Sequence, residues 1–169
     1  RSRKYNVDRT RELYGKHYTI HWPGEEHDSA RGVRRSPLYY QLKEKGAVYG
    51  AKYGWERANW FAPEGVEPRD EFTFEVPNWF AAVAAEHRNA RENVVLIDQT
   101  SFCKFEVEGP GALSLLNRLC ANQIDRPVGK IIYTQMCNQR GTIECDLTVG
   151  RLAEDRFFLV VGTAFGLRA

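Results

Sequence analysis

The sequence predicts an α+β fold in which a mixed or antiparallel sheet carries helices on one face. Two observations favour this fold class: short strand-like runs are joined by tight turns, and helix-like stretches separate some of them. The clearest run is 133–152, where two strand-like stretches flank a turn at 138–141. We therefore expect residues 130–137 and 142–151 to pair as a hairpin.

The first part of the chain is rich in aromatic and turn residues. From residue 1 to 62 we expect, in order, a short helix capped by Asp8, a strand at 18–22, a helix at 38–45, a strand at 47–52 and a loop at 54–63. Pro37 favours the helix start that follows it, and Gly46 is a suitable residue to end that helix. The loop carries three large aromatic side chains that need packing partners.

Residues 63–77 contain three prolines and are expected to form a linker. The sequence therefore predicts one domain at residues 1–62 and a second at 78–169. In the second segment we expect a helix at 79–91 capped by Asn78, strands at 94–98, 102–108, 130–137, 142–151 and 157–162, and another helix starting near Gly109-Pro-Gly-Ala112.

Charge and cysteine patterns exclude several functions. Residues 1–57 hold 13 Lys and Arg against 7 Asp and Glu, and residues 58–169 hold 11 against 15. The basic residues are interleaved with acids, so we expect no nucleic-acid partner. No apolar run reaches the ~18 residues of a membrane span, and we expect no membrane partner. The four cysteines lack zinc-ligand spacing and fit a reducing compartment.

The main candidate for a functional residue is Asp146, a carboxylate in the middle of an otherwise apolar strand. Strand alternation places Asp146 and Thr148 on one face, and Tyr133 is expected on the neighbouring strand. Spacing alone leaves alternatives open: the face could be plain solvent-exposed surface, Tyr133 a packing aromatic, and Thr148 an ordinary strand residue.

Two blocks of sequence resemble known families. The first block, Gly46–Phe61 with Arg31–Leu38 before it, is similar to the end of the flavin half of dimethylglycine and sarcosine dehydrogenases. Its Gly54-Trp-Glu-Arg-Ala-Asn-Trp-Phe61 stretch has Ala58 in place of the usual Pro. Residues 79–162, with Asp98-Gln-Thr-Ser-Phe102, Gly109-Pro-Gly-Ala112 and the 133–152 run, resemble the folate-binding domain of the glycine-cleavage T-protein (aminomethyltransferase) family.

The resemblance implies that residues 1–62 end a FAD-dependent oxidoreductase central domain and that residues 78–169 begin a T-protein-like domain. The chain would then be a fragment of a longer flavin enzyme that demethylates dimethylglycine or sarcosine. That enzyme would pass the one-carbon unit to tetrahydrofolate. The resemblance also implies Asp146 as the catalytic residue, and Tyr133 and Thr148 as folate contacts.

Further expectations concern cofactors, partners and location. FAD would be bound outside this chain, which has no Gly-x-Gly-x-x-Gly fingerprint. The partners would be a small amine, folate and, as one option for the electron acceptor, an electron-transfer protein. The location would be the bacterial cytoplasm or the mitochondrial matrix. The alternative is a non-catalytic relative similar to the pyruvate dehydrogenase phosphatase regulatory subunit, which acts through protein contacts.

Overall fold

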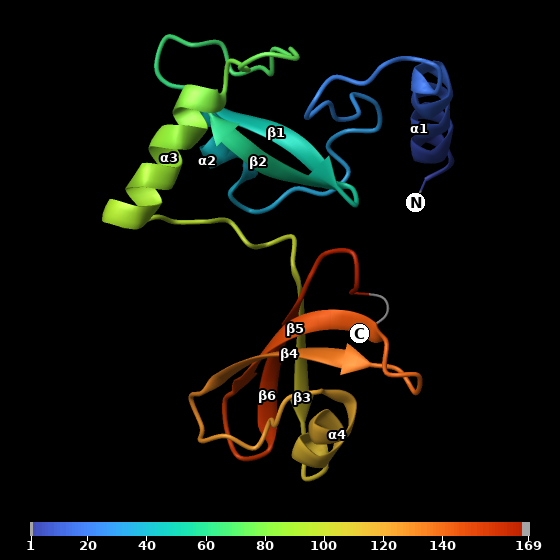
Figure 1. Ribbon diagram of the computed structural model, residues 1–169, viewed down its shortest axis with the longest axis vertical. Coiled ribbons are helices and arrows are strands. Elements are labelled where there is room, and N and C mark those ends of the chain that lie inside the picture. The colour runs from blue at the N-terminus through green and yellow to red at the C-terminus, as the bar shows by residue number, and fades with distance from the viewer. Residues whose placement is uncertain (1, 167–169) are drawn as a thin grey trace. The chain divides into compact units, whose positions relative to one another are not determined.

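The computed structural model describes residues 2–166, and it divides into two compact units at residues 98 and 99 (Figure 1). The first unit contains α1 (Arg3–Lys16), α2 (Tyr39–Glu44), β1 (Ala47–Lys52), β2 (Trp55–Phe61) and α3 (Phe80–Glu92). The second contains β3 (Cys103–Glu108), α4 (Ala112–Leu119), β4 (Ile131–Cys137), β5 (Ile143–Arg151) and β6 (Arg156–Val161). The predicted α+β fold class is confirmed. No helix within residues 2–166 is long and apolar enough to cross a membrane.

The N-terminal helix α1 starts earlier than the sequence predicted. The Ser2 hydroxyl caps it by accepting a hydrogen bond from the Tyr5 amide at 3.2 Å, so Asp8 lies inside the helix and the predicted cap was wrong. The predicted strand at 18–22 was also wrong. Tyr18 and Ile20 are 85% and 84% exposed there, and no strand within residues 2–166 pairs with this stretch.

Glu12 of α1 anchors the following loop. Its carboxylate accepts hydrogen bonds from the backbone amides of Asp28 at 2.7 Å and Ser29 at 3.0 Å, and from the Ser29 hydroxyl. Lys16 Nζ lies 3.2 Å from Glu12 Oε1. Burial alone would raise the pKa of Glu12, but these bonds to the charged form lower the pKa to about 2. The loop is therefore held by a carboxylate that stays ionised over most of the pH range.

The expected loop at 54–63 is instead the second strand of a hairpin, in which β2 pairs antiparallel with β1. Tyr53 and Gly54 turn the chain with φ of 51° and 84°. The aromatic side chains explain the strand: Trp60 is 2% exposed, packs with Val48 and Ala62, and donates from Nε1 to Asp70 at 2.8 Å.

Two helix ends flank this hairpin. Gly46 follows α2 with φ of 86°, and a Cβ there would lie 2.5 Å from the Ala62 carbonyl oxygen, so glycine is required as predicted. The start of α3 differs from the prediction. Asn78 does not cap it, because its side chain accepts from the Glu71 amide at 3.1 Å and donates to the Arg69 carbonyl at 2.9 Å.

The second unit is a four-stranded antiparallel sheet in the order β3-β6-β5-β4 (Figure 1). Residues 94–98 are not a strand, contrary to expectation, and Val94 and Leu96 are more than 90% exposed. α4 covers one face of the sheet. The buried core between them consists of Ala112, Leu116, Cys120, Ile124, Cys145, Leu147, Val149, Phe157, Leu159 and Val161. The other face carries the candidate site.

Candidate functional site

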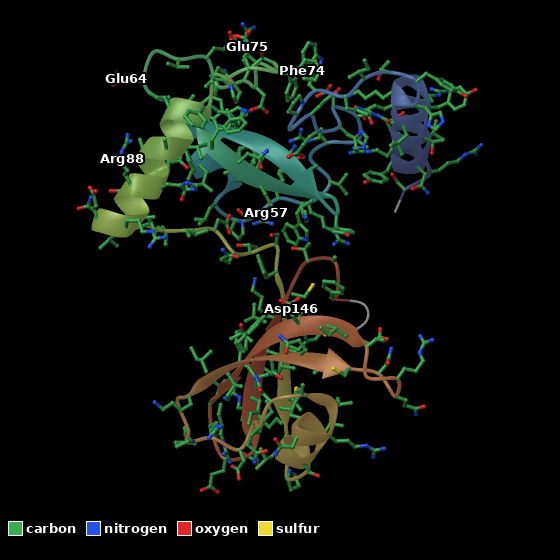
Figure 2. All side chains as sticks on the ribbon, viewed as in Figure 1. Arg57, Glu64, Phe74, Glu75, Arg88 and Asp146 are labelled. Atoms are coloured by element: carbon green, nitrogen blue, oxygen red, sulfur yellow. The ribbon has the colours of Figure 1, made fainter. Side chains whose placement is uncertain are left out.

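β5 divides its side chains between the core and the open face of the sheet. Cys145, Leu147 and Val149 are at most 2% exposed and point into the core. Asp146 is exposed and Thr148 is half-buried, so both lie on the opposite face, as strand alternation predicted. Figure 2 labels Asp146 on the sheet of the second unit. The Asp146 carboxylate therefore avoids the cost of burying a charge and stays available to a ligand.

Tyr133 of β4 joins these two residues across the hairpin. It lies directly opposite Thr148 in the strand register, and Gln135 lies opposite Asp146. The Tyr133 hydroxyl donates a hydrogen bond to Asp146 Oδ2 at 3.0 Å. The prediction that Tyr133, Asp146 and Thr148 share one face is confirmed. Their roles in catalysis and binding stay predictions.

Asn122 fixes the backbone around Tyr133 on the edge strand β4. The Asn122 side-chain amide donates to the Tyr133 carbonyl at 2.7 Å, and the Asn122 backbone amide donates to Thr134 Oγ1 at 3.0 Å. Thr134 is fully buried, and this bond satisfies its hydroxyl. Tyr133 is 59% exposed, so it presents a flat aromatic surface on a rigid strand.

The turn of the hairpin is held by its own residues. Asn138 Oδ1 accepts from the backbone amides of Arg140 at 2.9 Å and Thr142 at 3.2 Å, and Gly141 has the positive φ of 76° that the turn requires. Asn138 Nδ2 donates to Glu144 at 2.6 Å. Glu144 on the open face is thus engaged in the turn, whereas Asp146 is bonded to Tyr133.

The two buried cysteines of the second unit, Cys120 and Cys145, do not provide a nucleophile at this site. Burial raises the pKa of the Cys120 thiol to about 11, and it also raises the pKa of Cys145. Both thiols are therefore protonated at neutral pH and act as small core side chains. Within residues 2–166, no group of three or more His, Cys, Asp or Glu side chains could hold a metal ion.

The site combines a carboxylate, a phenol, a hydroxyl and an amide on one accessible sheet face. The sequence prediction missed Gln135, which lies opposite Asp146, and Val160 of β6, which lies opposite Thr148. Gln135 could have been found from its spacing, because it is two residues after Tyr133 on the same strand. The position of Val160 beside Thr148 follows from the order of the strands in the sheet, which could not be predicted from the sequence.

Comparison with known proteins identifies the family of this chain. A family model described as the GCVT N-terminal domain matches residues 38–168, and a model described as the FAD dependent oxidoreductase central domain matches residues 1–36. Because the first match covers more than half of the chain, this chain belongs to the GCVT N-terminal domain family. A crystal structure of the glycine cleavage system aminomethyltransferase T from Bartonella henselae matches with a TM-score of 0.63 and 27% identity, over 81% of this chain and 33% of that one.

Curated relatives are similar over nearly the whole chain. The 4-methylaminobutanoate oxidase (formaldehyde-forming) of Paenarthrobacter nicotinovorans is 44% identical over 94% of this chain. The mitochondrial dimethylglycine dehydrogenase of Rattus norvegicus is 31% identical over 95%, and the mitochondrial pyruvate dehydrogenase phosphatase regulatory subunit of Mus musculus is 35% identical over 96%. The chain spans 19% of the length of each.

These findings confirm the resemblance stated from the sequence, with its flavin and T-protein parts in the expected order. They do not settle the domain boundaries. The two family matches meet at residues 36 and 38, and the compact units meet at 98 and 99. The boundaries expected at residues 62 and 78 stay a proposal.

Proposed function

We propose that the full-length protein is a flavin-dependent oxidoreductase that removes an N-methyl group from a small secondary or tertiary amine and transfers the one-carbon unit to tetrahydrofolate. The names of the relatives support this class, because they include an oxidase and a dehydrogenase of N-methyl amines. The electron acceptor would be oxygen or an electron-transfer protein. The bacterial cytoplasm or the mitochondrial matrix would be the location, in line with the bacterial and mitochondrial relatives.

The observation that carries the proposal is the pair formed by Tyr133 and Asp146 on the open face of the sheet, with a hydrogen bond of 3.0 Å. The residues present fit a reduced folate. The exposed Tyr133 ring offers a stacking surface for a flat pterin, and Thr148 opposite it offers a small hydrogen-bonding group. When bound, tetrahydrofolate supplies the nitrogen atoms that accept the one-carbon unit.

In this proposal, Asp146 has the catalytic role. Its carboxylate would hold positive charge on the transferring group and accept a proton, while the Tyr133 hydroxyl keeps Oδ2 oriented. The core packing of Cys145 and Leu147 on either side of Asp146 fixes the strand and limits its movement. FAD would be held outside this chain, and the proposal gives residues 2–166 no role in the flavin step.

A second candidate function has one specific observation in its favour. The phosphatase regulatory subunit is 35% identical to this chain, more than the dimethylglycine dehydrogenase at 31%. The name of that relative gives it a regulatory role, which in this chain would require protein contacts at the sheet face in place of a folate. The Tyr133–Asp146 pair favours the enzyme, because a carboxylate aligned by a phenol suits proton transfer.

The test is folate binding by the full-length protein, measured by calorimetry with tetrahydrofolate. We expect saturable binding that weakens about 2- to 10-fold in Tyr133→Phe and in Thr148→Val, since each change removes one exposed hydrogen bond. The control is Thr163→Val, whose hydroxyl donates to the Ser101 carbonyl at 2.8 Å, and its affinity should be unchanged. Absence of folate binding in the unmodified protein would reject the enzyme and favour the regulatory function.

A further inference from the structure

The boundary between the two family matches falls inside the first compact unit. The match to the FAD dependent oxidoreductase central domain ends at residue 36 and the GCVT match begins at residue 38, whereas the compact unit extends to residue 98. Residues 2–36 are called the flavin segment below, and the β1–β2 pair is called the first hairpin. Domains of one chain are expected to move relative to each other unless the contact between them is extensive. The contacts between the flavin segment and the first hairpin therefore decide whether the two parts are flexibly linked at this boundary.

A buried ion pair lies at the centre of this contact. Arg31 of the flavin segment donates to both carboxylate oxygens of Glu56 on β2, from Nε at 3.0 Å and from Nη2 at 2.6 Å. Glu56 is 7% exposed, and Arg31 Nη2 also donates to the Tyr49 carbonyl of β1 at 2.6 Å. Burial alone would raise the pKa of Glu56, but the bonds from Arg31 and from the Gly32 amide lower this pKa. The carboxylate is therefore ionised at neutral pH, and the loss of either partner would leave a buried charge unpaired.

Backbone hydrogen bonds cross the same boundary in both directions. The Arg34 amide donates to the Gly54 carbonyl, and the Glu56 amide donates to the Arg34 carbonyl, both at 2.8 Å. Arg34 thus pairs with β2 like a short parallel strand. The Gly32 amide donates to Glu56 Oε1 at 2.5 Å. The flavin segment and the first hairpin therefore satisfy part of each other's backbone.

Glu26 attaches the flavin segment to the first hairpin at a second point. Its carboxylate accepts from the Ala51 amide of β1 at 2.6 Å and from the Asn59 side-chain amide of β2 at 2.9 Å. Gly50 leaves room for this contact, because a Cβ at residue 50 would overlap the Glu26 carboxylate. The first hairpin is therefore shaped to receive the flavin segment at Glu26 as well as at Arg31.

We propose that the first hairpin is a docking surface for the flavin part of the full-length protein, and that Glu26, Arg31 and Glu56 hold this part on the hairpin as one rigid body. Pro37, the residue between the two family matches, is then not a flexible hinge. Because the contacts involve only residues 26–59, this docking does not depend on the proposed reaction.

Hydrogen exchange of the full-length protein, resolved to single amides by fragmentation mass spectrometry, tests the docking. Four backbone amides report on it, because each donates across the boundary: Gly32, Arg34, Ala51 and Glu56. The amides that join β1 to β2 report on the first hairpin alone. In the unmodified protein, we expect both sets of amides to be protected from exchange.

Two variants weaken the docking in different ways. Glu56→Gln removes the charge of the buried pair, and the four amides should lose about 10²-fold or more in protection while the β1–β2 amides keep theirs. Gly50→Ala retains every charge and displaces the Glu26 carboxylate, so the Ala51 amide should lose about tenfold in protection. The control is Glu106→Gln in the second unit, which breaks an exposed ion pair with Arg156 and should change none of these amides.

Rapid exchange of the four amides in the unmodified protein would overturn the proposal, because the flavin segment would then move independently of the first hairpin. An equal loss of protection in the β1–β2 amides of Glu56→Gln would overturn it too, since Glu56 would then stabilise the hairpin in general. Gly50→Ala keeps the test decisive if Glu56→Gln does not fold. Full protection of the Ala51 amide in Gly50→Ala would refute the attachment through Glu26.

Discussion

Replacement of Asp146 by Asn tests the catalytic assignment most directly, because it removes a charge and keeps the shape of the side chain. Asn retains a carbonyl oxygen that can accept the hydrogen bond from the Tyr133 hydroxyl, which spans 3.0 Å. Asp146 is exposed, and its strand neighbours point into the core, so the sheet should be unaffected. Any large effect would therefore arise from the lost carboxylate.

The expected size of the effect separates catalysis from positioning. One positioned acid–base group contributes ~10²–10⁴-fold to a rate, and 10² corresponds to about 2.7 kcal/mol. The exposed Tyr133–Asp146 hydrogen bond would contribute only about 0.5–1.5 kcal/mol, or roughly 2- to 10-fold. A loss of 10² or more thus requires a chemical role for the carboxylate.

The assay follows both half-reactions of the full-length enzyme with tetrahydrofolate present. Flavin reduction by the amine should be nearly unchanged in Asp146→Asn, because the proposed function assigns that step to a flavin domain outside this chain. Methylene-tetrahydrofolate formation should fall at least 10²-fold, and free formaldehyde should accumulate instead. Glu144→Gln is the control, since this carboxylate on the same face is engaged by Asn138 in the turn. An unchanged yield and rate of methylene-tetrahydrofolate in Asp146→Asn would refute the reasoning.

Three further predictions concern stability and reactivity. Leu116→Ala should lower the free energy of unfolding of the sheet unit by about 2–5 kcal/mol, because Leu116 is 1% exposed, whereas Leu115→Ala on the exposed side of α4 should change it by less than about 0.5 kcal/mol. Hydrogen exchange in urea measures the free energy of unfolding of both variants. Equal losses in Leu116→Ala and Leu115→Ala would contradict the burial of Leu116 against the sheet. Iodoacetamide at pH 8 should label the exposed Cys137 in the native protein and the buried Cys145 only after denaturation, as mass spectrometry can check. The pKa of Glu12 is lowered from 4.5 to about 2, so its stabilisation of the loop is fully present above pH 4.5 and is lost as the pH falls towards 2. The two amides bonded to Glu12 should lose exchange protection in that window, and Glu12→Gln should show reduced protection already at pH 6.

Much of the sheet could be predicted from the sequence because strand alternation is a local property. The faces of β5 follow from a period of two, and the turn at Asn138 and Gly141 follows from side-chain chemistry within four residues. Neither the prediction of the β5 faces nor the prediction of the turn requires knowledge of distant residues, and both predictions are confirmed.

The failures occurred where distant partners decide the structure. Residues 18–22 alternate like a strand but have no partner, and so they remain irregular. β2 was expected to be a loop, yet its pairing with β1 and the burial of Trp60 make it a strand. The Tyr133–Asp146 hydrogen bond likewise depends on the cross-strand register, which a single strand does not reveal.

The separation of the sheet into a packed face and an open face affects how this fold can change during evolution. Substitutions at Tyr133, Asp146 or Thr148 leave the packed side chains of β5 and β6 untouched, so they alter ligand chemistry at little cost in folding. A descendant could lose the proposed one-carbon transfer through a few exposed replacements and remain fully folded. An ancestor of this kind could therefore give rise both to enzymes and to regulatory proteins with the same backbone.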